Sequence, residues 1–453
     1  MVPPMNLSCF KAYDVRGVVP DTLNEEIARR IGRAFALEID PGRVVLGHDI
    51  RLTSPALASA LSEGLRDGGV DVFDIGLCGT EEIYFATAHY GMGGGIMVTA
   101  SHNPMDYNGI KFVRDHSRPV SGDTGLVAIR ERAESGEFPD AGRRGTLEKL
   151  DARPAYIQHL LSYVDRDHLK PLRIAMDAGN GGAGMVVREL AHHLPFEIIE
   201  VNFEPDGRFP NGIPNPLLPE RRAACIDAVR AHGADLGVAW DGDFDRCFLF
   251  DEQGNFIEGY YIVGLLAEAF LRKSPGAMIV YDPRLTWNTI ETVRDAGGVP
   301  VQSKAGHSFI KEQMRAEDAV YGGEMSAHHY FRDFFYCDSG MIPWLLITEL
   351  LSAADAPLST LVAERMAAYP CSGEINFMVS DIAQTLSRVR EIHEPLAIRV
   401  DETDGIGFEM ENWRFNLRAS NTEPVIRLNV ETRGDPALLR DKVEALSGLI
   451  SEA

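Results

Sequence analysis

Three aspartates in the segment DGDFDR, residues 241–246, have the spacing of a metal site. Asp241, Asp243 and Asp245 alternate along the chain, so a tight loop can turn all three carboxylates toward one cation. Hard oxygen ligands without histidine or cysteine favour Mg²⁺, which binds a few carboxylates together with phosphate oxygens and water. The apolar runs LGVAW and CFLFD flank the segment, and carboxylates gathered there would repel one another strongly without a cation. We therefore predict a magnesium site; the alternative is a solvated acidic turn.

A serine in the segment TASHNP, residues 99–104, is a candidate nucleophile. Ser101 follows the glycine-rich run GGGIMV, and His102 beside it could activate the hydroxyl. Serine, asparagine and proline are also typical of a turn or a helix N-cap, which is the structural alternative. No G-x-S-x-G sequence surrounds Ser101, and its absence argues against an ordinary hydrolase triad.

The segment RASNTEP, residues 418–424, could bind a phosphate group. Arg418 offers a fork of N–H donors, and Ser420, Asn421 and Thr422 add short polar side chains in a turn. Such donors suit the oxygens of a phosphate. A surface arginine followed by an ordinary polar turn is the alternative.

The segment GEMSAHH, residues 323–329, could bind the hydroxyl groups of a sugar. Glu324, Ser326 and His328 occupy alternating positions, so one face of an extended loop would offer an acceptor, a hydroxyl and an imidazole. The alternative is a capping box or a polar loop without a ligand.

Basic residues near glycines add further candidates. Arg16 in KAYDVRG, and Lys304 and His307 in KAGHSFIK, could face a phosphate, act in catalysis or lie at the surface. Lys111 lies among apolar residues in NGIKFV. A partly buried lysine has a depressed pKa and can act as a base, whereas an exposed lysine on an edge strand is the alternative.

The elements that must position these residues follow an internal repeat of strand, helix, strand, helix and strand. The expected strands with their following loops are 44–51, 70–76 and 93–104, then 174–181, 196–202 and 234–246, then 278–285, 299–306 and 319–329. This order is the signature of α/β units with mostly parallel sheets. Ligands bind at the carboxyl ends of such strands, so we expect the three polar loops to face one central cleft.

The chain is predicted to contain four domains. Three related α/β domains with mixed, mostly parallel sheets are followed by a segment that breaks the repeat, with strands near INFMV, GIGFEME, WRFNLRAS and VIRLNVET and two helices. This last segment predicts a smaller α+β domain with an antiparallel sheet. The predicted boundaries give domains at 1–150, 151–252, 253–366 and 367–453, which carry the serine loop, the metal loop, the hydroxyl-binding loop and the phosphate-binding loop respectively.

Composition excludes several other classes of protein. The 453 residues carry a net charge of −23 and are 45% hydrophobic, which excludes a mainly disordered chain and argues against nucleic acid or an anionic membrane as the main partner. No apolar run reaches the length of a membrane span, and the start of the chain does not resemble a signal peptide. Six scattered cysteines without a C-x-x-C pair indicate reduced thiols in a cytoplasmic protein.

In this order, KAYDVRG, TASHNP, DGDFDR, GEMS-x-H and RASNTEP resemble the motifs of the phosphohexomutase family, which comprises phosphoglucomutases and phosphomannomutases, over essentially the whole chain. The resemblance implies the same four-domain fold and a phosphoserine at Ser101. It implies that one Mg²⁺ per chain is held by Ser101, through its phosphate, and by Asp241, Asp243 and Asp245. The phosphoserine would phosphorylate a hexose monophosphate to a sugar 1,6-bisphosphate, which is also the activator, and would then take back the other phosphate.

The resemblance also implies roles for the remaining candidates. His102 and Arg246 would neighbour the phosphoserine, and Lys111 and His307 are candidates for moving the proton of the reacting hydroxyl. The residues implied to bind substrate are Tyr13, Arg16, Arg284, Lys304, Glu324, Ser326, His328, Arg418, Ser420, Asn421 and Thr422.

The loop GEMSAHHYFRDF resembles that of bacterial phosphomannomutases that feed GDP-mannose synthesis. The implied reaction interconverts mannose 6-phosphate and mannose 1-phosphate. Ala327 stands where GEMSGH members have glycine, and this departure weakens the expectation of dual specificity. A phosphoglucomutase or a dual enzyme is the alternative within the family; a Mg²⁺-dependent sugar phosphatase and a silent sugar-phosphate binder are alternatives from other classes. We expect hexose phosphates as partners, no nucleic acid or membrane, and a monomer or weak homodimer.

Overall fold

The structure, a computed structural model, describes residues 6–419 and 425–451. Contacts within the chain divide it into two units. Unit 1 consists of Met1–Phe256 and His328–Asp355, and unit 2 consists of Ile257–Ala327 and Ala356–Ala453. The chain therefore passes from one unit to the other after residues 256, 327 and 355.

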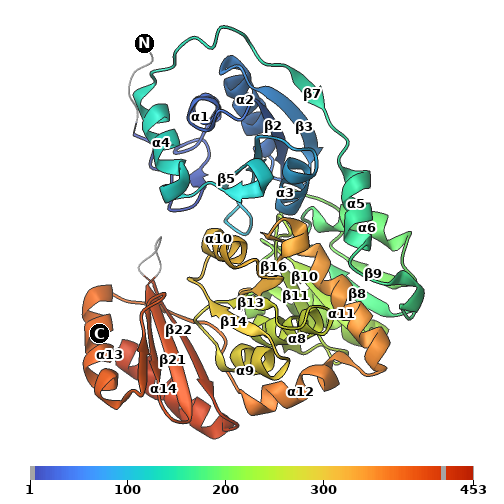
Figure 1. The fold of residues 1–453 in the computed structure, drawn as a ribbon, viewed down its shortest axis with the longest axis vertical. Helices are drawn as coiled ribbons and strands as arrows, with labels where there is room; N and C mark the ends of the chain where they lie inside the picture. Colours follow the sequence, from blue (N-terminus) through green and yellow to red (C-terminus); the bar gives the residue numbers. More distant parts are fainter. Residues whose placement is uncertain (1–5, 420–424, 452–453) are drawn as a thin grey trace. The chain divides into compact units, whose positions relative to one another are not determined.

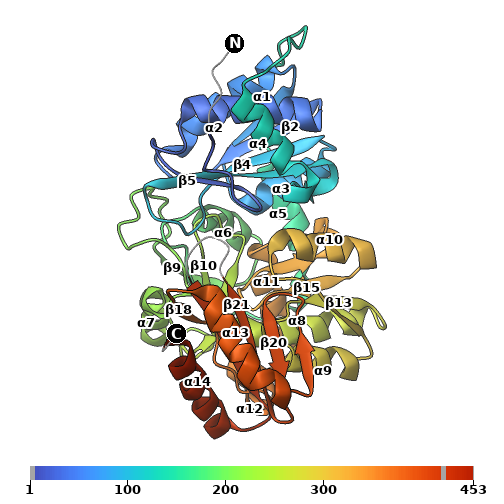
Figure 2. The same cartoon turned by 90° about the vertical axis from the view of Figure 1, so that its left-hand side faces the viewer.

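The first sheet of unit 1 combines parallel and antiparallel pairs. Its strands are hydrogen-bonded in the order β1 (Val15–Val18), β5 (Tyr107–Arg114), β4 (Gly94–Val98), β2 (Arg43–His48), β3 (Asp71–Leu77) and β7 (Leu147–Lys149), and β6 (Arg118–Pro119) pairs with β5. Strand β2 pairs in parallel with β3 and β4, whereas β5 is antiparallel to β4 and β1. The helices are α1 (Glu25–Ile39), α2 (Ser54–Asp67), α3 (Thr80–His89) and α4 (Leu126–Ser135). Helices α1 and α2 pack against each other on one face of this sheet, and α3 lies on the other (Figure 2).

Local sequence explains how these elements form. Helix α1 begins after Asn24, whose side chain accepts a hydrogen bond from the Ile27 N–H, and its buried stripe includes Ile27, Ile31 and Phe35. An N-cap asparagine and apolar residues at helical spacing are what such a start requires. Strand β4 is buried along its whole length, as expected for a strand covered on both faces.

The second sheet of unit 1 repeats the same arrangement. Strand β8 (Arg173–Asp177) lies between β9 (Glu197–Val201) and β10 (Leu236–Trp240) and pairs in parallel with both, and β11 (Cys247–Phe250) is antiparallel to β10. The order continues to β12 (Phe256–Ile257). Its helices are α5 (Arg153–Leu161), α6 (Ala183–Ala191) and α7 (Ala223–His232). Unit 1 ends with the antiparallel pair β16 (His329–Phe331) and β17 (Cys337–Asp338) and with helix α11 (Met341–Ala354).

Unit 2 contains the third repeat and the C-terminal sheet. Strand β13 (Met278–Tyr281) pairs in parallel with β14 (Val299–Gln302) and β15 (Tyr321–Gly323). The helices of this part are α8 (Gly259–Lys273), α9 (Trp287–Asp295), α10 (His307–Glu317) and α12 (Leu358–Ala368). The C-terminal sheet is antiparallel throughout, in the order β18 (Ile375–Met378), β22 (Val425–Thr432), β21 (Trp413–Ala419), β20 (Ile406–Glu409) and β19 (Arg399–Asp401). Helices α13 (Ile382–His393) and α14 (Pro436–Ser451) cover one face of this sheet (Figure 1).

The predicted fold class is confirmed. All nine repeat strands form, and in each repeat the first strand lies between the second and the third in a parallel arrangement. The C-terminal part is an α+β domain with an antiparallel sheet, as predicted. Several elements outside the repeat were not anticipated, among them helices α1, α8, α11 and α12 and strand β19. The domain boundaries and the central cleft stay predictions.

Two other expectations concern membranes and thiols. Within the described residues, no single helix is long and apolar enough to cross a membrane. Helices α11 and α12 reach the necessary length and apolar composition only when they are taken together as a bent pair. All six cysteines are free thiols, and five of them are buried.

Candidate active site

The three predicted metal ligands lie in the loop that follows the buried strand β10. Asp241, Asp243 and Asp245 are 0%, 0% and 3% exposed, respectively. One carboxylate oxygen of each lies within 4.8 Å of those of the other two. The loop stands at the carboxyl end of a parallel strand, where α/β sheets place their ligands.

In both Asp241 and Asp243, one carboxylate oxygen accepts hydrogen bonds and the other has no hydrogen-bond partner among the described residues. The Asp241 Oδ2 atom accepts hydrogen bonds from Ser101 Oγ at 2.7 Å and from Arg246 Nε at 3.0 Å. The Asp243 Oδ2 atom accepts from Lys111 Nζ at 2.7 Å and from Thr80 Oγ1 at 2.6 Å. The Oδ1 atoms of both aspartates are buried and have no hydrogen-bond partner among the described residues. Buried carboxylate oxygens without donors fit a cation, so this donor set suits a hard divalent metal.

The pKa values of Asp241 and Asp243 are shifted in opposite directions. Burial raises the pKa of Asp241 to about 6 against the attraction of Arg246. Burial and repulsion from Asp245 also oppose ionisation of Asp243, but the Lys111 ammonium outweighs them and lowers the pKa of Asp243 below its usual value. Positively charged neighbours, here Arg246 and Lys111, are therefore needed to stabilise several buried carboxylates in their ionised form.

Lys111 differs from its prediction in one respect. Burial lowers the pKa of Lys111, as expected, but the carboxylates of Asp243 and Asp245 outweigh burial and raise the pKa overall. The Nζ atom lies 2.7 Å and 2.6 Å from their Oδ2 atoms. The expectation of a depressed pKa is therefore wrong, because the sequence alone did not show which carboxylates surround this lysine.

Ser101 lies directly against the metal loop. Its Oγ atom is 3.0 Å from His102 Nδ1, and the Arg246 guanidinium contacts both His102 and Asp241. Ser101 adopts φ of 47°, a left-handed conformation that is uncommon for serine. A Cβ atom added at Gly242 would lie 2.6 Å from the Ser101 carbonyl oxygen, so only glycine allows this approach of the two loops.

Arg51 is a residue of this site that the sequence did not single out. It is 2% exposed, and its guanidinium donates to the carbonyl oxygens of Ser101 at 2.9 Å, Asn103 at 2.6 Å, Pro104 at 2.7 Å and Tyr107 at 3.0 Å. One side chain therefore fixes the main chain of the serine loop. The sequence signal that could have identified Arg51 is its position two residues after Asp49, the aspartate at the end of the first repeat strand.

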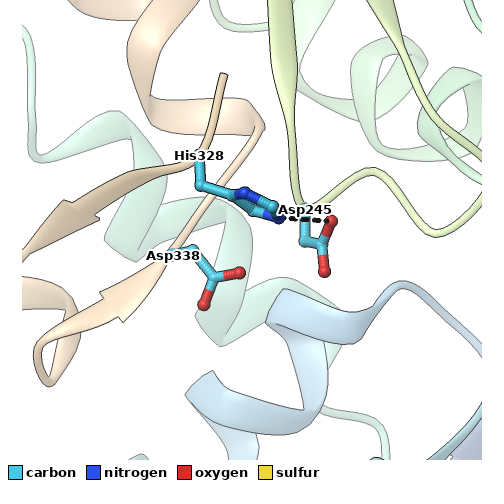
Figure 3. Close-up of side chains that lie close together, drawn as sticks. All are labelled: Asp245, His328 and Asp338. Carbon is cyan, nitrogen blue, oxygen red and sulfur yellow. Dashed lines mark ion pairs between the residues drawn. The ribbon is translucent and has the colours of Figure 1, made fainter. Parts of the chain in front are cut away.

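His328 lies beside the metal loop, between two carboxylates (Figure 3). Its Nε2 atom is 3.7 Å from Asp245 Oδ1, and ligand atoms of Asp245, His328 and Asp338 lie within 4.8 Å of one another. The pairing of β16 with β17 brings Asp338 to this place. Asp338 was not anticipated from the sequence.

Glu324 and Ser326 surround Arg284 in unit 2. The Arg284 Nη2 atom donates to Glu324 Oε1 and to Ser326 Oγ, each at 3.3 Å. The expected extended loop with one shared face does not form: the Ala327 N–H donates to the Glu324 carbonyl at 3.0 Å, which closes a turn. The turn separates His328 from the other two residues.

The remaining predicted residues lie as follows. In unit 1, Arg16 donates to Asp14 at 2.8 Å and to Asn103 of the serine loop at 3.2 Å, and Tyr13 is partly buried near it in the chain. In unit 2, His307 begins α10 and Lys304 lies over the Phe309 ring. The Arg418 guanidinium lies close to Asp404, and its Nη1 atom donates to Asp404 Oδ2 at 3.2 Å. Ser420, Asn421 and Thr422 lie outside the described residues.

Comparison with known proteins gives a consistent result along the chain. Residues 8–140, 154–254 and 258–369 match the alpha/beta/alpha domains I, II and III of phosphoglucomutase/phosphomannomutase, and residues 374–447 match its C-terminal domain.

Individual relatives cover nearly the whole chain. The chain is 62% identical to a Xanthomonas campestris pv. campestris protein named phosphohexose mutases, over 98% of this chain and 100% of that protein. It is 59% identical to an Escherichia coli phosphomannomutase, over 98% and 99%. The crystal structure of a phosphoglucomutase/phosphomannomutase family protein from Burkholderia thailandensis superposes with a TM-score of 0.88 at 34% identity, over 98% and 97% of the two chains. The chain belongs to the phosphoglucomutase/phosphomannomutase family.

Proposed function

We propose that this protein is a phosphomannomutase, an isomerase that interconverts mannose 6-phosphate and mannose 1-phosphate through a phosphoserine at Ser101 and a sugar 1,6-bisphosphate. The observation that carries the proposal is the 2.7 Å hydrogen bond from Ser101 Oγ to Asp241 Oδ2 of the buried aspartate cluster. The name of the Escherichia coli relative, phosphomannomutase, supports this reaction, and the name of the Xanthomonas relative supports a mutase that acts on hexose phosphates. GDP-mannose synthesis is the proposed use of the product.

The residues of unit 1 are suited to positioning a phosphoryl group. Arg246, next to both His102 and Asp241, would donate to phosphate oxygens on Ser101, because a guanidinium fork matches phosphate. Mg²⁺ bound by the three aspartates and the phosphate on Ser101 would offset negative charge on the transferring group. Lys111 and His307 are our proposed candidates for moving the proton of the reacting hydroxyl.

Substrate recognition is assigned to residues of both units. Glu324, Ser326 and His328 would bind ring hydroxyls, and Arg284 holds the first two in place. The remaining proposed substrate contacts are Tyr13, Arg16, Arg284, Lys304, Arg418, Ser420, Asn421 and Thr422. We also propose the domains 1–150, 151–252, 253–366 and 367–453, one Mg²⁺ per chain, activation by the bisphosphate, a monomer or weak homodimer, and a cytoplasmic location.

The first experiment measures conversion of mannose 1-phosphate and of glucose 1-phosphate to their 6-phosphates. The purified protein is assayed with Mg²⁺ and a trace of sugar bisphosphate, and free phosphate is followed in the same samples. We expect isomerisation that favours mannose, with little free phosphate. Equal or better turnover of glucose would shift the assignment to a phosphoglucomutase or dual enzyme, and phosphate release without isomerisation would replace the proposal with a phosphatase.

The substitution Ser101→Ala tests the phosphoserine. We expect isomerisation to fall by at least about 1,000-fold, because the group that carries the phosphoryl is lost. Ser62→Ala is the matched control, since Ser62 is also a buried serine, 4% exposed, within helix α2. A Ser101→Ala protein that keeps its activity would contradict the mechanism.

A further inference from the structure

The start of helix α3 holds the metal loop at two points. Thr80, the first residue of the helix, is 0% exposed. Its hydroxyl donates to Asp243 Oδ2 at 2.6 Å, and its N–H donates to the Asp243 carbonyl oxygen at 3.2 Å. One residue therefore restrains both the side chain and the main chain of a proposed metal ligand.

Phe244, the next residue of the metal loop, packs closely against the glycine that precedes helix α3. A Cβ atom added at Gly79 would lie 2.1 Å from the Phe244 ring, and one added at Gly182 would lie 2.9 Å from it. The ring is thus wedged between two glycines, and Phe244 adopts φ of 47°. The path of the loop between Asp243 and Asp245 is set by close packing against the start of α3.

The Thr80 hydroxyl is not needed to start its own helix. The N-cap is Gly79, and its N–H donates to the Glu82 side chain at 2.9 Å. A hydroxyl at a helix start commonly serves the helix itself, but this one is directed to a residue 163 positions away. Its main partner is the metal loop.

The direction of this hydrogen bond decides which oxygen of Asp243 remains for a ligand. Thr80 and Lys111 both donate to Oδ2, and Oδ1 is left buried without a partner among the described residues. Rotation about the carboxylate bond would exchange the two oxygens, and the donors oppose that rotation. Hydrogen bonds of this kind orient metal-binding carboxylates, and losing one typically costs 10–100-fold in metal affinity.

We propose that Thr80 is a positioning residue for Asp243, and that its hydroxyl presents Asp243 Oδ1 to the metal ion. Thr80 acts through Asp243 and touches neither the sugar nor the phosphoryl group. The inference rests on the metal site of the proposed function, and it adds a residue to which neither the motifs nor the family comparison assigns a role.

The test is the affinity for Mg²⁺ of the whole protein without sugar, measured by calorimetry, with the phosphorylation state of Ser101 matched by mass spectrometry. Thr80→Val keeps the shape of the side chain and removes the hydroxyl, and we expect Mg²⁺ affinity to fall by about 10-fold or more. Thr80→Ser keeps the hydroxyl, and we expect its affinity to return to within about 3-fold of the wild type.

Thr87→Val is the matched control on the same helix. Thr87 is also 0% exposed, but its hydroxyl donates to the Ile83 carbonyl of its own helix at 2.7 Å. We expect Mg²⁺ affinity to be unchanged in this variant. If Thr80→Val does not fold, Thr80→Ala and Thr80→Ser give the same comparison, since they differ only by the hydroxyl.

The outcomes separate this inference from the proposed function. Normal Mg²⁺ binding by Thr80→Val would overturn the inference alone, as would an equal loss in Thr80→Val and Thr87→Val, which indicates a general structural effect. Wild-type protein that binds no Mg²⁺ would overturn the proposed metal site together with the inference. Weak binding by Thr80→Val, with Thr80→Ser and Thr87→Val close to wild type, is the result we expect.

Discussion

Ala327 adopts a backbone conformation that alanine rarely adopts. Its φ is 70° and it is 2% exposed. The left-handed conformation costs a residue with a Cβ atom about 1–2 kcal/mol, whereas glycine adds about 0.5–1 kcal/mol of chain entropy to the unfolded state. We therefore predict that Ala327→Gly leaves the free energy of unfolding unchanged or raises it by up to about 1 kcal/mol, as measured by urea denaturation.

Ala267→Gly provides the comparison. Ala267 is 0% exposed and lies within helix α8, where glycine costs about 1 kcal/mol relative to alanine. A loss of stability in Ala327→Gly as large as in Ala267→Gly would show that the turn imposes no strain at residue 327.

Residue types and spacing predicted the centre of the site but not its supports. The three aspartates and Ser101 lie in short segments whose chemistry can be read directly, and the structure brings them together. Thr80 and Arg51 were not identified in this way, because the partners that give each residue its place in the site lie far along the chain. Their roles depend on which loops meet in the folded protein.

At the scale of elements, a buried ion pair joins the C-terminal sheet to the start of helix α9. Arg414 on β21 and Glu431 on β22 face each other, with 2.7 Å between Nη1 and Oε1. Glu431 also accepts the Thr286 N–H at 2.7 Å, and Arg414 donates to the Arg284 carbonyl at 3.0 Å. This pair therefore supports the main chain at Arg284, whose side chain contacts the proposed sugar-binding residues.

We predict that Arg414→Met strongly destabilises the protein. The substitution removes the cationic partner of the Glu431 carboxylate, which is 0% exposed, and breaking a buried ion pair costs about 3–5 kcal/mol. Arg188→Met is the control, because Arg188 pairs with Glu200 at the surface, where ion pairs add little. Equal unfolding transitions in urea for the two variants would contradict this prediction.

Apolar runs identified the strands of the repeat, but elements outside the repeat were missed whatever their length: helices α1 and α8, of 15 residues each, were not predicted. The nine repeat strands were predicted from apolar runs of adequate length. Strand β19 contains three residues, too few for any pattern to emerge. The expected alternation over Glu324, Ser326 and His328 failed for another reason: a turn at Ala327, closed by a backbone hydrogen bond, interrupts the extended chain.

At the scale of the whole molecule, the net charge of −23 opposes the folded state through self-repulsion. Salt screens such repulsion, since the Debye length falls from about 30 Å at 0.01 M to about 10 Å at 0.1 M. We predict that the melting temperature of the metal-free protein rises by a few degrees over this range of NaCl, as followed by circular dichroism. A constant or falling melting temperature would show that attractive pairs, such as Arg188 with Glu200, dominate instead.

The interleaving of the two units has a consequence for how this chain can change over generations. Each unit is assembled from two separate stretches of sequence, because the chain crosses after residues 256, 327 and 355. A single genetic exchange, duplication or truncation therefore cannot transfer or remove either unit intact. Ser326 and His328 illustrate the constraint: they are separated by one residue and belong to different units. Recombination that keeps either unit whole must therefore exchange both of its stretches together.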